Sequence, residues 1–289
     1  MKRFRILWAG VCIVLAAVFL AVNIAQQTSQ QDGGPVFTIP EGTLSVSIED
    51  GEDALLQGIT ALDGEDGDVT SSILIESLSN FYGVNKRLAT FAAFDSDGNV
   101  SKASRVIQYS DYTSARFSLL HALRYETGED IDLSELVQAT DCLDGDVSSK
   151  VKVSTDSSLS TRTAGVYQIT FSVTNSAGDT TSLSTELEVY DPDYNNADIN
   201  LTEYLVYCEA GDDEPDYRSY VDSVVAGSVR YTFSSGAASA TGNDGSILRR
   251  SALRVRSSID MDTPGIYQVY LTYNGEDYQG TTLLLVVVE

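Results

Sequence analysis

Apolar and polar side chains alternate with a period of two through much of the chain, which is the pattern of half-buried β-strands. The clearest examples are 167-YQITFSV-173 and 267-YQVYLTY-273, and both are rich in Tyr, Val, Ile, Phe and Thr. Such stretches are followed by glycine-bearing turns at 95-DSDGN-99, 175-NSAGD-179 and 274-NGED-277. A turn of this kind between two alternating stretches predicts a β-hairpin. We therefore expect short antiparallel strands, and no helix after the N-terminal segment.

The N-terminal segment departs from this alternation, because the run from Ile6 to Ile24 is almost entirely apolar. Its length is close to the roughly 20 residues that a helix needs to cross a bilayer. Three basic residues precede the run: Lys2, Arg3 and Arg5. Basic residues stay on the cytoplasmic side of a membrane. The sequence thus predicts a single-pass signal-anchor transmembrane helix in residues 1–25, with a cytoplasmic N-terminus and extracellular C-terminal domains.

A cleavable signal peptide is the alternative for this segment. Cleavage requires small residues one and three places before the cut, and Ala25 has Asn23 at the second of these places. The following stretch, residues 26–35, is polar and contains glycine, which predicts a flexible stalk. The apolar run 283-LLLVVV-288 is too short to cross a membrane, and we predict a buried last strand there.

The part of the chain after the stalk repeats itself. The segment 59-ITALDGEDGDVTSSILI-75 aligns with 137-VQATDCLDGDVSSKVKV-153, and 90-TFAAFDSDGN-99 aligns with 170-TFSVTNSAGD-179. A third copy shares the signature G-[VI]-Y-Q with the second, and it is lengthened by an insertion around 234–246. The predicted units are 36–112, 113–192 and 193–289.

These motifs resemble the immunoglobulin-like repeats of bacterial surface proteins, a group that includes repeats first described in pesticidal crystal proteins and the related hyalin-type repeats. The second unit fits this pattern best, through Ala139, Asp141, Asp144 to Val147, Gly165, Tyr167 and Gly178. The first unit has Asn85 and Arg87 where Gly and Tyr are expected, and the third keeps Gly265 and Tyr267 but lacks D-G-D-V. The resemblance implies immunoglobulin-like β-sandwiches. The expected fold is therefore all-β, with three tandem immunoglobulin-like antiparallel β-sandwiches after the one N-terminal transmembrane helix that the apolar run predicts.

Charge and cysteine content limit the possible partners. The formal charge is −24, and the first 25 residues hold three basic groups and no acidic one, so the rest carries −27. A surface with this charge repels nucleic acid and anionic lipid, and we expect neither as a partner. The cysteines are Cys12, Cys142 and Cys208. They are too few for a disulfide framework, and we expect two separate thiols outside the membrane segment.

Two acidic segments, 63-DGEDGDVT-70 and 141-DCLDGDVS-148, offer the first candidate site. Loops at one pole of such a sandwich lie together. The segment 63–70 is therefore expected beside the hairpin loop 95–99, and the segment 141–148 beside the hairpin loop 175–179. Calcium takes six to eight oxygen ligands and accepts flexible loops. An Asp-Gly-Asp turn, however, forms through its own backbone hydrogen bonds without a metal. The two interpretations are compatible, and both stay open. The candidate calcium ligands are Asp63, Asp66, Asp68, Asp141, Asp144 and Asp146.

A cluster of arginines, 249-RRSALRVR-256, opposes the general charge. Arg249, Arg250, Arg254 and Arg256 are the candidate partner-binding residues, for an anionic polymer or an acidic protein surface. The alternative is a solvated sheet face. The chain has one histidine, His121, which lies in 117-FSLLHALRYE-126, where we expect a strand at the start of the second unit. With one histidine, a catalytic triad or a zinc site is not expected, and we predict that the protein is not an enzyme.

Together these features predict a membrane-anchored bacterial cell-surface protein. Its immunoglobulin-like repeats would act as a spacer and as an adhesion or protein-interaction module. The alternative is a carbohydrate- or cell-wall-binding envelope protein. The expected partner is an unknown surface protein or envelope glycan, in addition to the membrane through the N-terminal helix.

Overall fold

The computed structural model describes residues 33–155, 159–191 and 196–289. The predicted transmembrane helix, residues 1–25, lies outside these residues. Within them, no helix is long and apolar enough to cross a membrane. The described chain forms two compact units, of which the first ends at Tyr112 and the second runs from Thr113 to Glu289.

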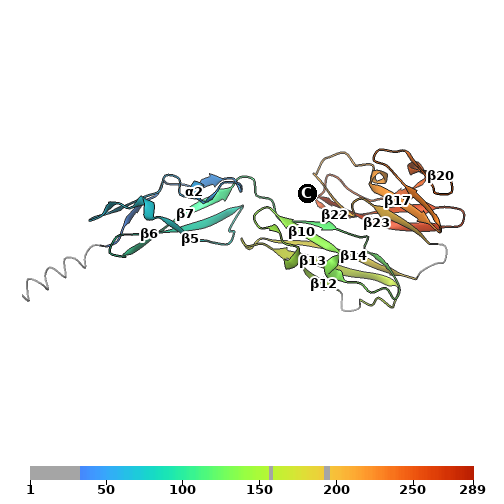
Figure 1. The fold of residues 1–289 in the computed structure, drawn as a ribbon, viewed down its shortest axis with the longest axis horizontal. Helices are drawn as coiled ribbons and strands as arrows, with labels where there is room; N and C mark the ends of the chain where they lie inside the picture. The colour runs from blue at the N-terminus through green and yellow to red at the C-terminus, as the bar shows by residue number, and fades with distance from the viewer. Residues whose placement is uncertain (1–32, 156–158, 192–195) are drawn as a thin grey trace, which may run out of the picture. The chain divides into compact units, whose positions relative to one another are not determined.

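The first unit is a sandwich of two sheets, with the strand orders β1-β3-β4 and β2-β7-β6-β5 (Figure 1). Its long strands β6 and β7 form the predicted hairpin around the turn 95–99. Its strands are β1 (Val36–Thr38), β2 (Leu44–Val46), β3 (Thr60–Asp63), β4 (Gly67–Asp68), β5 (Leu74–Leu78), β6 (Lys86–Phe94) and β7 (Val100–Tyr109), and its short helices are α2 (Glu52–Leu55) and the 3-10 turn η1 (Thr70–Ser72).

The second unit begins with a sandwich of the same plan, in the orders β11-β10-β8 and β12-β13-β14-β9. Here β13 and β14 form the long hairpin. Its elements are β8 (Arg116–Leu119), β9 (Arg124–Glu126), η2 (Leu133–Glu135), β10 (Val137–Asp141), β11 (Gly145–Asp146), η3 (Ser148–Lys150), β12 (Lys152–Thr155), β13 (Gly165–Thr174) and β14 (Thr180–Tyr190).

The third sandwich has the orders β15-β17-β18 and β16-β23-β22-β21, and it adds a two-stranded sheet, β19-β20, that is absent from the described residues of the other two. The added sheet lies in and next to the predicted insertion. The elements are β15 (Ala197–Leu201), β16 (Leu205–Cys208), η4 (Tyr217–Tyr220), β17 (Val221–Ala226), β18 (Val229–Thr232), β19 (Ser239–Thr241), β20 (Ile247–Arg249), η5 (Arg250–Ala252), β21 (Arg254–Arg256), β22 (Gly265–Asn274) and β23 (Gln279–Val288).

One feature unites the three copies beyond the hairpin. In each, a short early strand pairs in parallel with the last strand: β2 with β7, β9 with β14, and β16 with β23. The first strand of each copy, by contrast, pairs antiparallel in the opposite sheet. The described chain is therefore all-β, and it holds three sandwich-like units built to one plan, as the repeats predicted.

Two local predictions were wrong. A helix was not expected after the N-terminal segment, yet Glu52–Leu55 forms one turn, with acidic residues in its first turn and Leu55 buried. Negative charge at a helix N-terminus is favourable. The stretch 117–126 was expected to be one strand, but it is divided between β8 and β9, which belong to different sheets. His121 lies where the chain passes from one sheet to the other, between two residues, Leu119 and Leu123, that the core buries.

The alternating pattern is confirmed by burial within the hairpins. Along β13, Ile169 and Phe171 are buried while their neighbours face outward. The repeated tyrosine anchors the start of this strand, because the hydroxyl of Tyr167 donates to the carbonyl of Thr163 at 2.7 Å. Tyr267 makes the same contact in the third sandwich, at 2.8 Å. This is the tyrosine corner of immunoglobulin-like domains.

In the first sandwich a different side chain bonds the backbone before the equivalent strand, β6. Arg87 stands in place of the tyrosine and is 8% exposed. Its Nε donates to the carbonyl of Ser79 at 2.6 Å, and Nη2 donates to that of Leu78. Buried donors need partners, and the guanidinium finds them in two backbone carbonyls.

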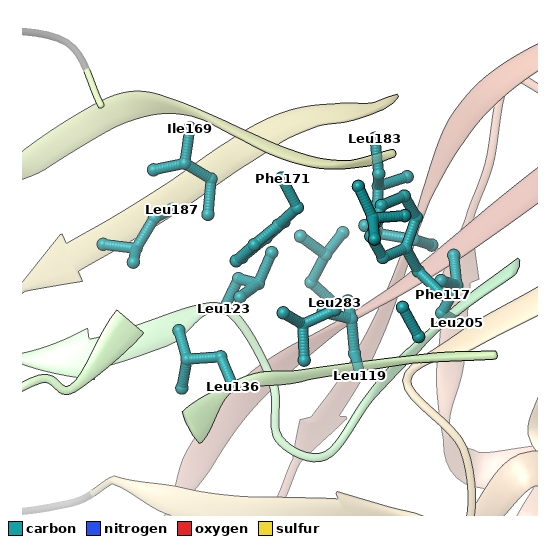
Figure 2. Packing of buried hydrophobic residues seen from close by; sticks show 14 of the residues in the cluster. Phe117, Leu119, Leu123, Leu136, Ile169, Phe171, Leu183, Leu187, Leu205 and Leu283 are labelled. Atoms are coloured by element: carbon teal, nitrogen blue, oxygen red, sulfur yellow. The ribbon is translucent and has the colours of Figure 1, made fainter. Parts of the chain in front are cut away.

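The second and third sandwiches share one hydrophobic core. Leu205 and Leu283 of the third sandwich pack among Phe117, Leu119 and Leu123 of the second (Figure 2). The backbone N–H of Phe117 also donates to the hydroxyl of Tyr207 at 2.8 Å, and burial raises the pKa of that hydroxyl. The two sandwiches are therefore joined by side chains that are buried only when both are present.

The last strand, β23, contributes side chains to two cores. Alternate residues of β23 face opposite sides, so Leu284 and Val286 enter the core of the third sandwich, while Leu283 and Leu285 enter the shared core. A strand buried on both faces has a continuous apolar sequence, which is what 283-LLLVVV-288 is. The prediction of a buried last strand is confirmed. Full burial of one leucine stabilises by about 1.5–3 kcal/mol.

Candidate functional site

The acidic segment of the first sandwich is a hydrogen-bonded turn. The Oδ1 atom of Asp63 accepts from the backbone N–H groups of Glu65 and Asp66, at 2.9 and 3.0 Å. Asp68 in turn accepts from the N–H of Thr70 at 2.9 Å. The predicted contact with the hairpin loop is confirmed, because the carboxylate of Asp66 accepts from both the N–H and the hydroxyl of Ser96.

The second sandwich repeats this arrangement. Asp144 accepts from the N–H and the hydroxyl of Ser176 and from the ammonium of Lys150, which lies 2.7 Å away. The bonds from Lys150 and Ser176 lower the pKa of Asp144. Asp146 accepts from the N–H and hydroxyl of Ser148, and those bonds lower the pKa of Asp146. All of these carboxylates are thus already held by the protein's own donors.

The two turns differ in one buried pair. In the second sandwich the Nδ2 of Asn175 donates to Oδ2 of Asp141 at 3.0 Å. The aligned residues of the first sandwich are Asp95 and Asp63, so the amide donor is replaced by a carboxylate. Consequently, Oδ2 of Asp63 is buried without a hydrogen-bond partner. An unsatisfied buried polar atom costs about 1–3 kcal/mol.

The structure places the six predicted calcium ligands in these turns: Asp63, Asp66, Asp68, Asp141, Asp144 and Asp146. Within the described ranges, no three acidic, histidine or cysteine side chains converge in the way that a metal ion requires. The turn interpretation is confirmed by the backbone hydrogen bonds. The calcium site stays a prediction.

The four predicted arginines lie on three elements, β20, η5 and β21. Arg254 and Arg256 lie on the edge strand β21, where both are exposed and flank the half-buried Val255. The guanidinium of Arg256 lies 4.5 Å from the centre of the Tyr270 ring. Arg249 ends β20 and Arg250 begins η5. Arg249 and Arg250 line one surface together with Arg218, which the sequence did not single out. Arg254 and Arg256 do not line that surface.

That surface is a cavity of about 670 Å³ in the third sandwich, formed by η4, the loop 236–238, the facing ends of β19 and β20, and the start of η5. It is lined by Asp216, Arg218, Ser219, Gly236, Ala237, Ala238, Ser239, Arg249, Arg250 and Ser251. Of these lining groups, three are cationic and one is anionic. The cavity therefore carries local positive charge within a chain whose formal charge is −24.

Arg250 holds the walls of this cavity together. Its Nε donates to the carbonyl of Ala237 at 2.7 Å. Nη1 donates to the carbonyls of Arg218 and Val221, and Nη2 to that of Ser234. The guanidinium also lies 4.5 Å from the centre of the Phe233 ring. One side chain thus ties the insertion to η4, and burial lowers the pKa of this arginine without an acidic partner in contact among the described residues.

Arg218 completes the basic lining. Its Nε donates to the carbonyl of Leu253 at 2.8 Å, and its Nη1 lies 3.6 Å from Oδ1 of Asp216. More than 30 residues separate it from Arg250, and no motif or period links the two positions. Sequence reasoning missed Arg218 for this reason. Arg250 had a signal in the sequence, since it belongs to the basic cluster 249-RRSALRVR-256.

The two outer thiols are separate, as expected. Cys142 and Cys208 are both free. Cys142 lies against the carbonyl of Thr113, and Cys208 faces the core of the third sandwich.

Residues 123–189 match the family described as "Bacterial surface protein, Ig-like domain". The second sandwich is therefore a bacterial surface protein immunoglobulin-like domain, which confirms the resemblance. Over 95 residues the chain is also 35% identical to an uncharacterized 81.3 kDa protein of Acholeplasma phage L2. That match covers 33% of this chain and 12% of the phage protein, so the chain corresponds to a small part of this relative.

Solved structures match this chain at low identity. One holds the M60 catalytic domain with the CBM51-1 and CBM51-2 domains of Clostridium perfringens ZmpB: identity is 13%, the match covers 84% of this chain and 37% of that one, and the TM-score is 0.25. Another is Drosophila N-cadherin EC1-4, with 13% identity, 89% and 76% coverage, and a TM-score of 0.25.

Proposed function

We propose that this protein is an adhesion module of a bacterial surface, in which the third sandwich carries the surface that binds a partner. The first sandwich acts as a spacer in this proposal, and residues 1–25 attach the chain to the membrane. The proposal rests on two facts: the second sandwich is a bacterial surface immunoglobulin-like domain, and function in such folds resides in loops added to the scaffold.

One observation carries the assignment to the third sandwich. Its insertion adds the sheet β19-β20, which has no counterpart in the parts of the first two copies that the structure describes, and this insertion forms part of a cavity with three arginines. The shared core gives that cavity a firm base, because the second sandwich covers one face of the sheet that contains β23. A binding surface on a rigid support loses less entropy when it binds.

We propose binding rather than catalysis. The cavity is lined by arginine, serine and small residues, with its one carboxylate, Asp216, beside Arg218. Such groups hold an anion through charge-assisted hydrogen bonds. The partner in this proposal is a surface protein or an envelope glycan.

The proposal is tested by displaying the full chain on bacterial cells with a C-terminal epitope. Labelling of intact cells with an antibody checks that the epitope is outside, and fractionation checks that the chain stays with the membrane. Displaying cells should then bind envelope fragments or partner cells more strongly than cells with an empty vector. Equal binding of both, with the epitope exposed, would refute the adhesion function.

A further inference from the structure

We propose that the cavity between η4, the loop 236–238 and η5 binds an anionic group, a carboxylate or a phosphate, on a glycan. This inference rests on the proposed function, because it names the partner chemistry of the same sandwich. The residues differ from the arginine cluster that the sequence suggested. Arg218 and Arg249 contact the anionic group in this proposal, and Arg250 holds them in position. Arg254 and Arg256 do not take part.

The charge of the cavity is the first argument. Arg218, Arg249 and Arg250 line it with Asp216 as the one acid, whereas the whole chain has 42 acidic and 18 basic residues. An anion approaching this protein is repelled over most of the surface and attracted here. Charged groups interact over a Debye length of about 8 Å at physiological salt, so the three guanidinium groups act on the same small volume.

Arg249 supplies a free cationic group at the rim. It is exposed, and within the described part of the chain its side chain has neither an ion-pair nor a hydrogen-bond partner. It pairs across the small sheet with Ser239, and directly opposed residues point to the same face of a sheet. The guanidinium and the serine hydroxyl are therefore presented together, and both line the cavity.

Arg250 acts as a positioning residue. Backbone carbonyls from 218, 221, 234 and 237 occupy its donors, and these contacts hold the loop, η4 and the arginine in one arrangement. A preorganised site needs no rearrangement when the ligand arrives. Its donors go to neutral carbonyls, and Asp216 and Asp222 offset part of its positive charge, so Arg250 contributes chiefly by holding the walls in place.

The other lining groups favour a glycan over an acidic peptide. Three serines, Ser219, Ser239 and Ser251, offer hydroxyls that donate or accept, and the remaining lining residues, two alanines and a glycine, are small. No large apolar side chain is among these lining residues to hold a peptide side chain. A volume of about 670 Å³ lies within the range of small-ligand sites, roughly 300–1,000 Å³, and so suits a short saccharide segment.

The test is a calorimetric titration of the full chain in a non-ionic detergent. Four probes are used: an oligogalacturonate, which carries carboxylates; a glycerol-phosphate oligomer, which carries phosphates; a neutral dextran oligosaccharide; and polyglutamate, an acidic peptide. One or both anionic non-peptide probes should bind, and the salt dependence should show weaker binding at high ionic strength. Whichever of the two binds more tightly identifies the anionic group.

Variants then assign the residues. Arg249→Gln and Arg218→Gln should each weaken binding about 10-fold or more, which is the loss expected for one charge-assisted hydrogen bond. Arg230→Gln is the matched control: it removes one exposed arginine of the same sandwich that does not line the cavity, and affinity should stay within about 2-fold of wild type. A melting curve of each variant checks that the fold is intact.

Four results would overturn the site: no binding of either anionic oligomer, tighter binding of polyglutamate, equal loss in Arg230→Gln, or no loss in Arg249→Gln. The adhesion function has a separate outcome. If displayed cells carrying Arg249→Gln adhere as well as wild-type cells, this site is wrong and the adhesion function stands. If wild-type cells do not adhere, the adhesion function fails, whatever the calorimetry gives.

Discussion

Truncating Leu285 should destabilise two sandwiches at once. Leu285 is 1% exposed, it belongs to β23 of the third sandwich, and it packs in the core that contains residues of the second. Replacing a buried leucine by alanine costs about 2–5 kcal/mol, depending on how far the cavity collapses. Domains are stable by only about 5–15 kcal/mol, so Leu285→Ala removes a large part of the unfolding free energy.

Native-state hydrogen exchange measures this loss segment by segment. Three segments report on the three sandwiches: 86–94 in the first, 165–174 in the second and 265–274 in the third. If the second and third sandwiches open as one cooperative unit, Leu285→Ala should lower the protection free energies of 165–174 and 265–274 by the same amount, about 2–5 kcal/mol. The protection of 86–94, which belongs to the other compact unit, should not change.

Ile107→Ala is the matched control, because Ile107 is fully buried in the first sandwich. It should lower the protection of 86–94 and leave the other two segments as they are. The reasoning is refuted if Leu285→Ala exposes 265–274 while 165–174 keeps its wild-type protection. In that case the contacts of β23 with the second sandwich would contribute little, and the two sandwiches would be independent domains.

Three further predictions concern single contacts. Asp95→Asn should raise the stability of the first sandwich by about 1 kcal/mol, because an amide can donate to the unpartnered Oδ2 of Asp63. A melting point higher by roughly 4–8 °C would support this prediction, and an unchanged or lower melting point would contradict it. Tyr167→Phe should cost about 1 kcal/mol in urea unfolding, since the carbonyl of Thr163 loses its donor; no change in midpoint would mean that water replaces the hydroxyl. The pKa of Asp144 is lowered in the folded protein. This lowering contributes stability at pH values above the pKa of the unfolded carboxyl, near 4, and the contribution is lost as the pH falls through the lower pKa of the folded state. The drop in urea midpoint between pH 7 and pH 3 should therefore be smaller in Asp144→Asn than in the wild type, and an equal drop would refute this.

The comparison of copies within the sequence was informative wherever structure is local. The turns at 63–68 and 141–146 and the hairpin at 175–179 depend on residues within a few positions of one another, and the sequence predicted each of them. Asx turns and positive backbone angles are set by side chains next to the turn, as at Gly67 and Gly145, both in the left-handed region. The same comparison indicated that loops 63–68 and 95–99 meet, because the plan of a sandwich brings them to one pole.

The candidate site was predicted only in part. Arg249 and Arg250 were found because they oppose the net charge, but Arg254 and Arg256 were grouped with them only by closeness along the chain. In the structure the chain passes from η5 into β21, so these two lie on an edge strand outside the cavity. Arg218 entered instead, from an element some 30 residues earlier. Charge in the sequence shows that a basic group exists, and it does not show which other groups face it.

The sequence by itself determined the strands, the hairpins and the threefold repetition, because alternation and turn chemistry act over a few residues and need no distant partner. Only the tertiary structure decided that the second and third sandwiches share one core. The apolar run of β23 required burial on both faces, but a hydrophobic side chain has no directional preference for its partner. Which surface covers Leu283 and Leu285, and which arginines line one cavity, depends on how the finished sheets pack.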